Sequence, residues 1–173
     1  MMRRLFDLAN LTLLLLTGIF VYRSFPHLPE RIPMHFDMAG RPDRWGGRGG
    51  FVILFVVPLV ITAVFYVLIR FVPGLGASAR RMNIPHREEF LKLPAEKRDV
   101  YWSLLKEFFA GLAVAINLLF YLIIRGTVRI AIGETGLLPF RLMLPALILM
   151  GLIMICYIWR LSTLPGKLIR GEA

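Results

Sequence analysis

The sequence contains little chemistry of the kinds that mark redox, metal or ion-carrying proteins. It has one cysteine and three histidines in 173 residues. A single thiol, Cys156, excludes an intramolecular disulfide and a CxxC redox motif. No histidine falls within a long apolar run, and the deep parts of those runs contain no acidic residue. Membrane haem proteins and ion carriers need such side chains there, so the sequence disfavours both classes.

Charged residues are also scarce, and acids are scarcer than bases. Only 18% of the residues are charged while 57% are hydrophobic, and the mean hydropathy is +0.68. The 21 Lys and Arg exceed the 11 Asp and Glu, which gives a net charge of +10. Because the bases cluster at the ends of apolar runs, we interpret them as membrane anchors. The expected partner is the lipid bilayer; no nucleic acid and no cofactor is expected.

Four apolar segments are long enough to cross a membrane as helices. They comprise about residues 5–22, 51–72, 104–124 and 140–161. The first segment follows a basic start, as in a signal peptide, but no small-x-small cleavage site follows it, so we expect an uncleaved helix. The sequence thus predicts an all-α integral membrane protein, with one polytopic domain over residues 1–173.

Two connecting segments and two polar residues complete the predicted arrangement. With both termini in the cytoplasm, the Lys and Arg of the cytoplasmic segments outnumber those outside. Residues 25–50 then form an extracytoplasmic loop and residues 73–103 a cytoplasmic one, in which Pro94 predicts the start of a helix leading into the third span. Asn117 is expected to bond a neighbouring helix, and Asp7 to be neutralised by Arg3 or Arg4.

The first loop, residues 25–50, has more pattern than a spacer needs. Its prolines bias the chain toward extended backbone. Apolar side chains alternate with His35 and Asp37 over residues 34–38. This period of two predicts a short strand with the two polar residues on one side and the apolar ones on the other, and Gly40 marks a turn. The loop is therefore expected to be partly extended.

The same loop carries a long motif, Leu28-Pro29-x-x-Ile32-Pro33-x-His35-Phe36-Asp37-x-x-Gly40-x-Pro42-Asp43-x-Trp45-Gly46. It resembles domain of unknown function 1648 of SdpI-like bacterial membrane proteins, a family named for immunity to the sporulation-delaying peptide toxin. Residues 83–98 are similar to the second loop of longer uncharacterised members. The resemblance implies a place in the bacterial cytoplasmic (inner) membrane and immunity or sensing against an extracytoplasmic peptide or toxin.

The candidate ligand-binding residues are the prolines, aromatics, glycine and polar side chains of the motif. They are Pro29, Pro33, His35, Phe36, Asp37, Gly40, Pro42, Asp43 and Trp45. A proline-stiffened extended segment offers backbone donors and soft apolar pockets to a peptide. The alternative is that the same side chains fold onto the bundle as a lid.

Other functions are weaker but stay open. His35, Asp37 and Asp43 are weak candidates for metal ligands, because their spacing matches no recognised zinc pattern. Such side chains more often make turn and cap hydrogen bonds, with Asp43 holding backbone amides before Trp45. Ser24 is the one nearby hydroxyl that could act as a nucleophile, so we expect no enzyme. The runner-up functions are an accessory subunit of a membrane complex, with a protein partner or a second copy, and a metal-dependent membrane enzyme.

Overall fold

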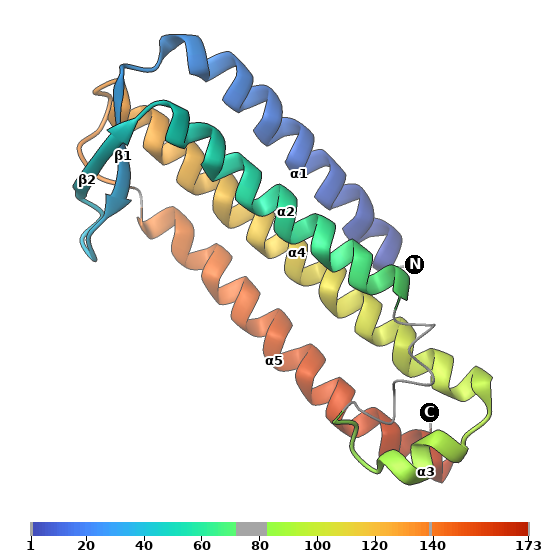
Figure 1. Cartoon of the computed structure of the whole chain (residues 1–173). Coiled ribbons are helices and arrows are strands. Elements are labelled where there is room, and N and C mark those ends of the chain that lie inside the picture. The colour runs from blue at the N-terminus through green and yellow to red at the C-terminus, as the bar shows by residue number, and fades with distance from the viewer. Residues whose placement is uncertain (1, 72–82, 139, 173) are drawn as a thin grey trace.

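The computed structural model describes residues 2–71, 83–138 and 140–172 (Figure 1). Its helices are α1 (Met2–Ser24), α2 (Gly49–Phe71), α3 (Arg87–Lys92), α4 (Ala95–Ala131) and α5 (Phe140–Arg170), and a 3-10 turn, η1 (Phe25–His27), follows α1. Strands β1 (Arg31–Phe36) and β2 (Pro42–Gly47) form an antiparallel hairpin between α1 and α2. Over these residues, four helices are long and apolar enough to span a membrane. The predicted helical membrane architecture is confirmed.

The longest helix, α4, extends well past the span predicted at residues 104–124. It has 37 residues and begins directly after Pro94. At 1.5 Å per residue it is about 55 Å long, against about 30 Å for the hydrocarbon core of a bilayer. Its charged first turns therefore project beyond the apolar zone. The predicted loop 73–103 thus contains α3 and the start of α4, and its residues 73–82 lie outside the described residues.

The same helix is the centre of the bundle, because α1, α2 and α5 all pack against it. Its buried face carries small residues, among them Ala110, Gly111, Ala113 and Ala115. Small side chains let helix backbones approach closely in a membrane. At Gly111 an added Cβ would lie 3.3 Å from Phe6 of α1 and 3.8 Å from Ile153 of α5. This position therefore sets how closely three helices meet.

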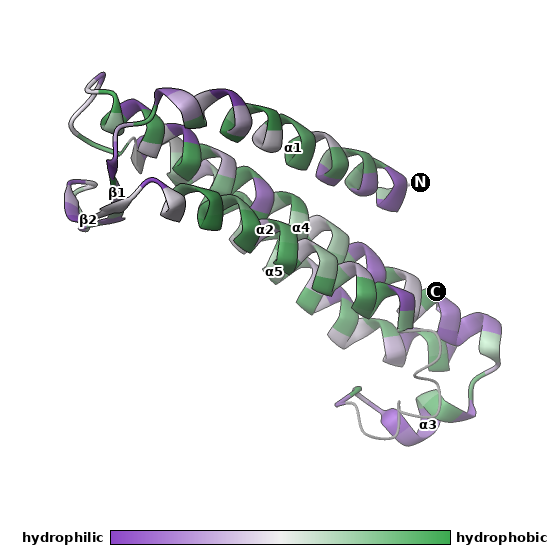
Figure 2. Ribbon diagram, turned by 45° about the horizontal axis from the view of Figure 1, so that its top comes forward, coloured by the Kyte–Doolittle hydropathy of each residue, from purple (hydrophilic) through white to green (hydrophobic). Residues whose placement is uncertain are grey.

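The outer faces of the long helices are apolar. Leu15 of α1, Val60 of α2 and Leu152 of α5 are each more than half exposed. Figure 2 shows hydrophobic residues along the middle of the helices and hydrophilic ones near the hairpin and α3. Such faces are compatible with lipid and not with water. The chain is a multi-pass membrane protein.

The two ends of the bundle are built differently. The hairpin lies at one end, and both termini lie toward the other (Figure 1). At the second end α3 packs on α4 and α5 through an aromatic cluster, in which the rings of Phe90 and Tyr101 are 5.2 Å apart and those of Tyr101 and Trp102 also 5.2 Å apart. The cluster fastens the projecting part of α4 to the end of α5.

Candidate functional site

Apolar residues of the motif anchor the hairpin to the bundle. Leu28 and Ile32, each one residue before a motif proline, are 4% and 0% exposed. They belong to one buried cluster with Phe51 of α2 and Ile124 of α4. Burying each such side chain contributes about 1.5–3 kcal/mol. This half of the motif therefore fixes the position of the hairpin.

Asp37 organises the turn between the strands. Its Oδ1 accepts hydrogen bonds from the N–H groups of Ala39 at 2.9 Å and Arg41 at 2.8 Å. Gly40 adopts a φ of +78°, which costs glycine little. The carbonyl of Gly40 accepts the N–H of Leu138 at 2.8 Å, so the turn is tied to the segment between α4 and α5. Asp37 thus makes turn hydrogen bonds of the kind expected of the aspartates in this loop.

Asp43 pairs instead with His35 of the other strand. Its Oδ1 lies 2.6 Å from Nδ1 of the imidazole. Both side chains are exposed, and an exposed pair of this kind contributes only about 0–1 kcal/mol to stability. The contact therefore orients the imidazole ring more than it stabilises the hairpin.

Irregular pairing changes which side chains of the hairpin share a face. The register shifts between Pro33 and His35, which leaves Met34 as an extra residue in β1. Such a bulge interrupts the period of two. As a result the consecutive residues 34–37 all line one cavity. Met38, expected on the apolar side of the strand, is 94% exposed in the turn.

The nine candidate ligand-binding residues fall into two groups. The exposed group consists of Pro29, His35, Asp43 and Trp45. The partly or wholly buried group consists of Pro33, Phe36, Asp37, Gly40 and Pro42. A large partner in the aqueous phase reaches the first group directly. Phe36 and Asp37 are reached through the cavity that they line.

The three weak candidates for metal ligands are engaged elsewhere. Asp37 uses its carboxylate in the turn, and Asp43 uses its carboxylate on His35. Within the part of the chain that the structure describes, no group of three or more His, Cys, Asp or Glu side chains is arranged to hold a metal ion.

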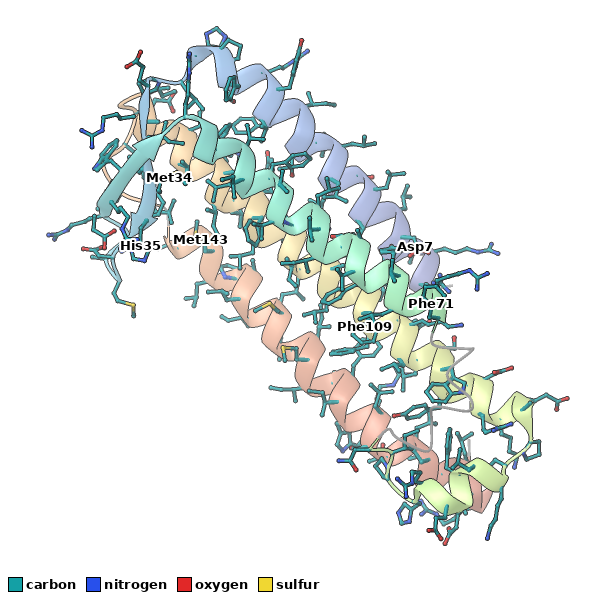
Figure 3. All side chains as sticks on the ribbon, viewed as in Figure 1. Asp7, Met34, His35, Phe71, Phe109 and Met143 are labelled. Carbon is teal, nitrogen blue, oxygen red and sulfur yellow. The ribbon has the colours of Figure 1, made fainter. Side chains whose placement is uncertain are left out.

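A cavity of about 320 Å³ lies beneath the hairpin and is open on one side. Residues 34–37 form its roof, and Figure 3 shows Met34 and His35 close to Met143 near the start of α5. The other lining residues come from α2, α4, α5 and the segment between the last two: Leu54, Leu119, Ile123, Thr127, Leu138, Met143 and Leu147. The cavity is therefore apolar below and polar only at its upper end.

One polar group in the wall of this cavity has no partner. Thr127 is 0% exposed, and its Oγ1 makes no hydrogen bond in the structure. Leaving a buried hydroxyl unpaired costs about 1–3 kcal/mol. Sequence reasoning did not identify Thr127, because threonine occurs on any face of a membrane helix.

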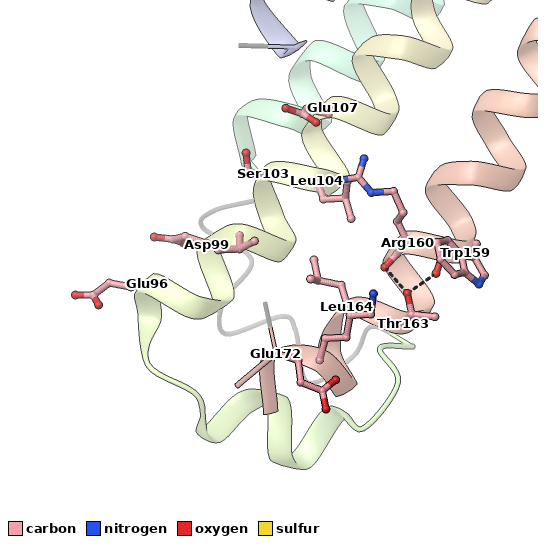
Figure 4. A pocket seen from close by; sticks show the side chains of 12 residues that line it. Glu96, Asp99, Ser103, Leu104, Glu107, Trp159, Arg160, Thr163, Leu164 and Glu172 are labelled. Carbon is pink, nitrogen blue, oxygen red and sulfur yellow. Dashed lines mark hydrogen bonds between the residues drawn. The ribbon is translucent and has the colours of Figure 1, made fainter. Parts of the chain in front are cut away.

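A larger cavity, of about 700 Å³, lies between the first turns of α4 and the last turns of α5 (Figure 4). The charged residues that line it are acidic Glu96, Asp99 and Glu107 of α4, basic Arg160 and Lys167 of α5, and acidic Glu172 just after α5. Trp159 and Leu164 add apolar surface. The cavity therefore presents both signs of charge around an apolar floor.

Nearer the terminal end of the bundle, a buried polar network joins three helices. Asn117 of α4 donates to Oδ1 of Asn10 of α1 at 2.9 Å and to Oγ1 of Thr62 of α2 at 3.1 Å. Asn10 donates in turn to the carbonyl of Ala110 at 2.9 Å. These groups satisfy one another, so the network fastens helices together and leaves little for a ligand.

The network continues to the surface through Tyr66. Its hydroxyl donates to Oδ1 of Asp7 at 2.6 Å and lies 3.5 Å from Nδ2 of Asn10. Arg3 Nε is 3.7 Å from the other carboxylate oxygen of Asp7. Asn117 and Asp7 thus have partners of the kinds expected from the sequence. Tyr66 was not anticipated, because its ring lies within an apolar run without any spacing signal.

Comparison with known proteins gives a coarse assignment. A family model described as a domain of unknown function (DUF1648) matches residues 12–62, which include the second half of α1, the hairpin and more than half of α2. An uncharacterized protein of Archaeoglobus fulgidus is 28% identical over 102 residues, which are 54% of this chain and 51% of that protein. The chain therefore spans about half the length of this curated relative. No solved structure matches. Over residues 12–62 the chain is similar to a domain of unknown function.

Proposed function

We propose that the protein recognises an extracytoplasmic peptide through the hairpin, residues 28–45, in an immunity or sensing role. In this proposal the hairpin faces the outside of a bacterial cytoplasmic membrane and both termini face the cytoplasm, as the distribution of Lys and Arg favours. The observation that carries the proposal is the exposed outer edge of β2.

Among the residues that the structure describes, β2 belongs to a two-stranded sheet and pairs with β1 alone. A strand in such a sheet uses the backbone groups of one edge, and those of the other edge can pair with an incoming strand. Residues 43–45 are exposed. Trp45 and Arg31 line a shallow pocket of about 300 Å³ beside the hairpin. A peptide added along β2 would place an apolar side chain in this pocket.

The direct test is photocrosslinking in cells from position 45, with the photoreactive residue in place of Trp45. The control carries the same residue at Tyr22, which is 81% exposed near the hairpin end of α1. Capture of one discrete peptide from position 45 and not from position 22 supports the proposal. Self-crosslinks alone would make the hairpin a lid.

Topology is tested separately with a membrane-impermeant maleimide. The native thiol is removed by Cys156→Ala, and Met38→Cys or Glu172→Cys is added. We expect labelling of Met38→Cys in intact cells and labelling of Glu172→Cys only after permeabilisation. The reverse result would place the hairpin in the cytoplasm and contradict the peptide proposal.

The cavity between α4 and α5 favours a second candidate, an accessory subunit that holds a segment of a partner protein. Its size suits a few side chains of such a segment, and its two walls would pair with charges of both signs. Val100 lines this cavity and is half exposed, so a larger side chain at position 100 would occupy the cavity. A stoichiometric complex that survives purification and is lost with Val100→Trp would favour this candidate.

A further inference from the structure

We infer that the cavity between α4 and α5 takes a basic amphipathic helix that continues a membrane span of another protein. Such a partner rests on the second candidate function, the accessory subunit, and gives the chemistry of the segment held there. It does not depend on peptide recognition by the hairpin. The depth of the cavity in the membrane, the form of its walls and its charges each favour this occupant.

The cavity runs outward from the edge of the apolar zone. Its innermost charged residues are Glu107 and Arg160, and the uncharged stretches 108–124 of α4 and 142–159 of α5 begin beside them. From Glu107 to Glu96 the α4 wall extends about 16 Å, or about 12 Å if α4 is tilted by about 40°. A headgroup layer is about 5–8 Å thick on each side of a bilayer. The outer part of the cavity therefore lies beyond a lipid headgroup, and a polypeptide can follow it over its whole length.

Both walls of the cavity are stripes along helices. Lining residues recur every three or four positions, from Glu96 through Leu104 to Glu107 on α4 and from Arg160 to Lys167 on α5. Over most of their length these walls use their backbone N–H and C=O groups within the helices, so an extended strand would find no backbone partners. A helix satisfies its own backbone and needs only side-chain contacts from a groove. Three turns, about 11 residues, would span the α4 wall.

The cavity already exposes apolar surface. Val100 and Trp159, which line it, are 50% and 61% exposed, and Figure 4 shows Leu104 and Leu164 between the two helices. The aromatic cluster with α3 holds α4 and α5 together at this end. A preformed site lowers the entropy cost of binding. Apolar side chains at every third or fourth position of the partner helix would cover this surface.

The acids of the cavity determine the charge that its partner must carry. In the described parts of α3, α4 and α5, the carboxylates of Glu96, Asp99 and Glu107 form no ion pair. The fourth acid, Glu172, is already bound by the guanidinium group of Arg170 at 2.7 and 2.9 Å. Three carboxylates on one wall are therefore available to Lys or Arg side chains of a partner.

The two bases of the cavity are partly engaged by their own helix. The ammonium group of Lys167 lies 5.8 Å from the ring centre of Trp159, and the guanidinium group of Arg160 lies 5.6 Å from that of Tyr157. In the proposed topology this end of the bundle is cytoplasmic. Lys and Arg concentrate in cytoplasmic segments next to membrane spans. The helical continuation of a partner's span would thus bring positive charge to the acids of α4.

The test uses the full chain in phosphatidylcholine vesicles with a synthetic probe peptide. The probe has an uncharged Leu/Ala span followed by three helical turns with Lys on one face and a diazirine residue on the apolar face. After irradiation, crosslinked residues are mapped by mass spectrometry. We expect crosslinks on residues 96–107 and 159–167, and about tenfold fewer from a probe with Glu in place of Lys. Equal capture of the two probes would overturn the inference.

A double variant tests the carboxylates and is expected to fold, because the two side chains are exposed. Glu96→Gln with Asp99→Asn should lower crosslinking of the Lys probe about fivefold, since two charge contacts at a rim are lost. Glu88→Gln with Glu89→Gln, on exposed residues of α3 outside this cavity, is the matched control and should leave crosslinking unchanged. Equal effects of the two double variants would contradict a site on α4.

The accessory function and the chemistry of its partner can fail separately. If purification yields a stoichiometric partner that is lost with Val100→Trp, but the Lys probe is not captured, the accessory function stands and the basic helix is wrong. If Val100→Trp removes bound phospholipid from the purified protein and leaves probe crosslinking unchanged, the cavity belongs to a lipid and both proposals fall.

Discussion

The replacement Asn117→Leu removes the centre of the buried network while keeping the size of the side chain. It eliminates the bonds to Asn10 and Thr62 and leaves the Oδ1 of Asn10 without its donor. Hydrogen bonds between membrane helices contribute on average about 0.6 kcal/mol and at most about 1.7 kcal/mol each. With two bonds lost and a buried acceptor exposed to an apolar side chain, we expect the free energy of unfolding to fall by about 2 kcal/mol.

The assay is reversible unfolding of the purified protein in mixed micelles, followed by helical circular dichroism as denaturing detergent is added. Thr62→Val is measured alone and together with Asn117→Leu, because a double-mutant cycle isolates the energy of one contact. We expect a coupling of about 0.5–1 kcal/mol between these two positions. Thr17→Val is the matched control, since Thr17 is also buried but its hydroxyl donates to the carbonyl of Leu13 in its own helix.

Two results would refute this reasoning. If Asn117→Leu destabilises no more than Thr17→Val, the network contributes nothing beyond ordinary packing. If the effects of Asn117→Leu and Thr62→Val simply add, the two side chains do not interact in the folded protein in the membrane-mimetic environment.

Three further replacements test close packing by the same unfolding assay. Gly40→Ala should destabilise the protein more than Gly133→Ala. Both glycines have a positive φ, which costs a substituted alanine about 1–2 kcal/mol, but only the Cβ at position 40 would also lie 2.8 Å from a backbone carbonyl oxygen, that of Leu138. Equal losses would contradict the contact between Gly40 and the segment after α4. Gly46→Ala should cost about 1–3 kcal/mol through a clash with Met34, and adding Met34→Ala should recover part of that loss; no recovery would count against the bulged register. Gly111→Leu should lower the free energy of unfolding by about 1–3 kcal/mol, because the larger side chain pushes α1 and α5 away from α4. An unchanged unfolding curve would contradict the close packing at Gly111.

The sequence predicts the membrane architecture well, because each span is encoded locally. Residues 51–72 are a run of 22 with a single charge, Arg70, and such a run predicts a membrane helix by itself; α2 runs from Gly49 to Phe71. Pro94 specifies a helix start in the same local way, and α4 begins at the next residue. Such signals depend on the length of a segment and on its backbone chemistry, and both can be determined from the sequence without knowledge of the fold.

The candidate site is harder to predict because its geometry depends on tertiary structure. Alternation over residues 34–38 indicates a strand, but the extra residue Met34 changes which side chains share a face. Asp37 holds the turn and Asp43 pairs with His35 because of where the turn falls, which the spacing alone does not give. The surroundings of Thr127 include residues of the hairpin, which lie far from it in the sequence and could not be assigned to it in advance.

The length of α4 has a mechanical consequence. One uninterrupted helix of about 55 Å carries part of the cavity beneath the hairpin at one end and part of the larger cavity at the other. For a rigid rod of this length, a tilt of about 5° about the hairpin end would move the other end by about 5 Å. The aromatic cluster with α3 moves with it. The two cavities lie toward opposite ends of the bundle and therefore share a wall made by one helix.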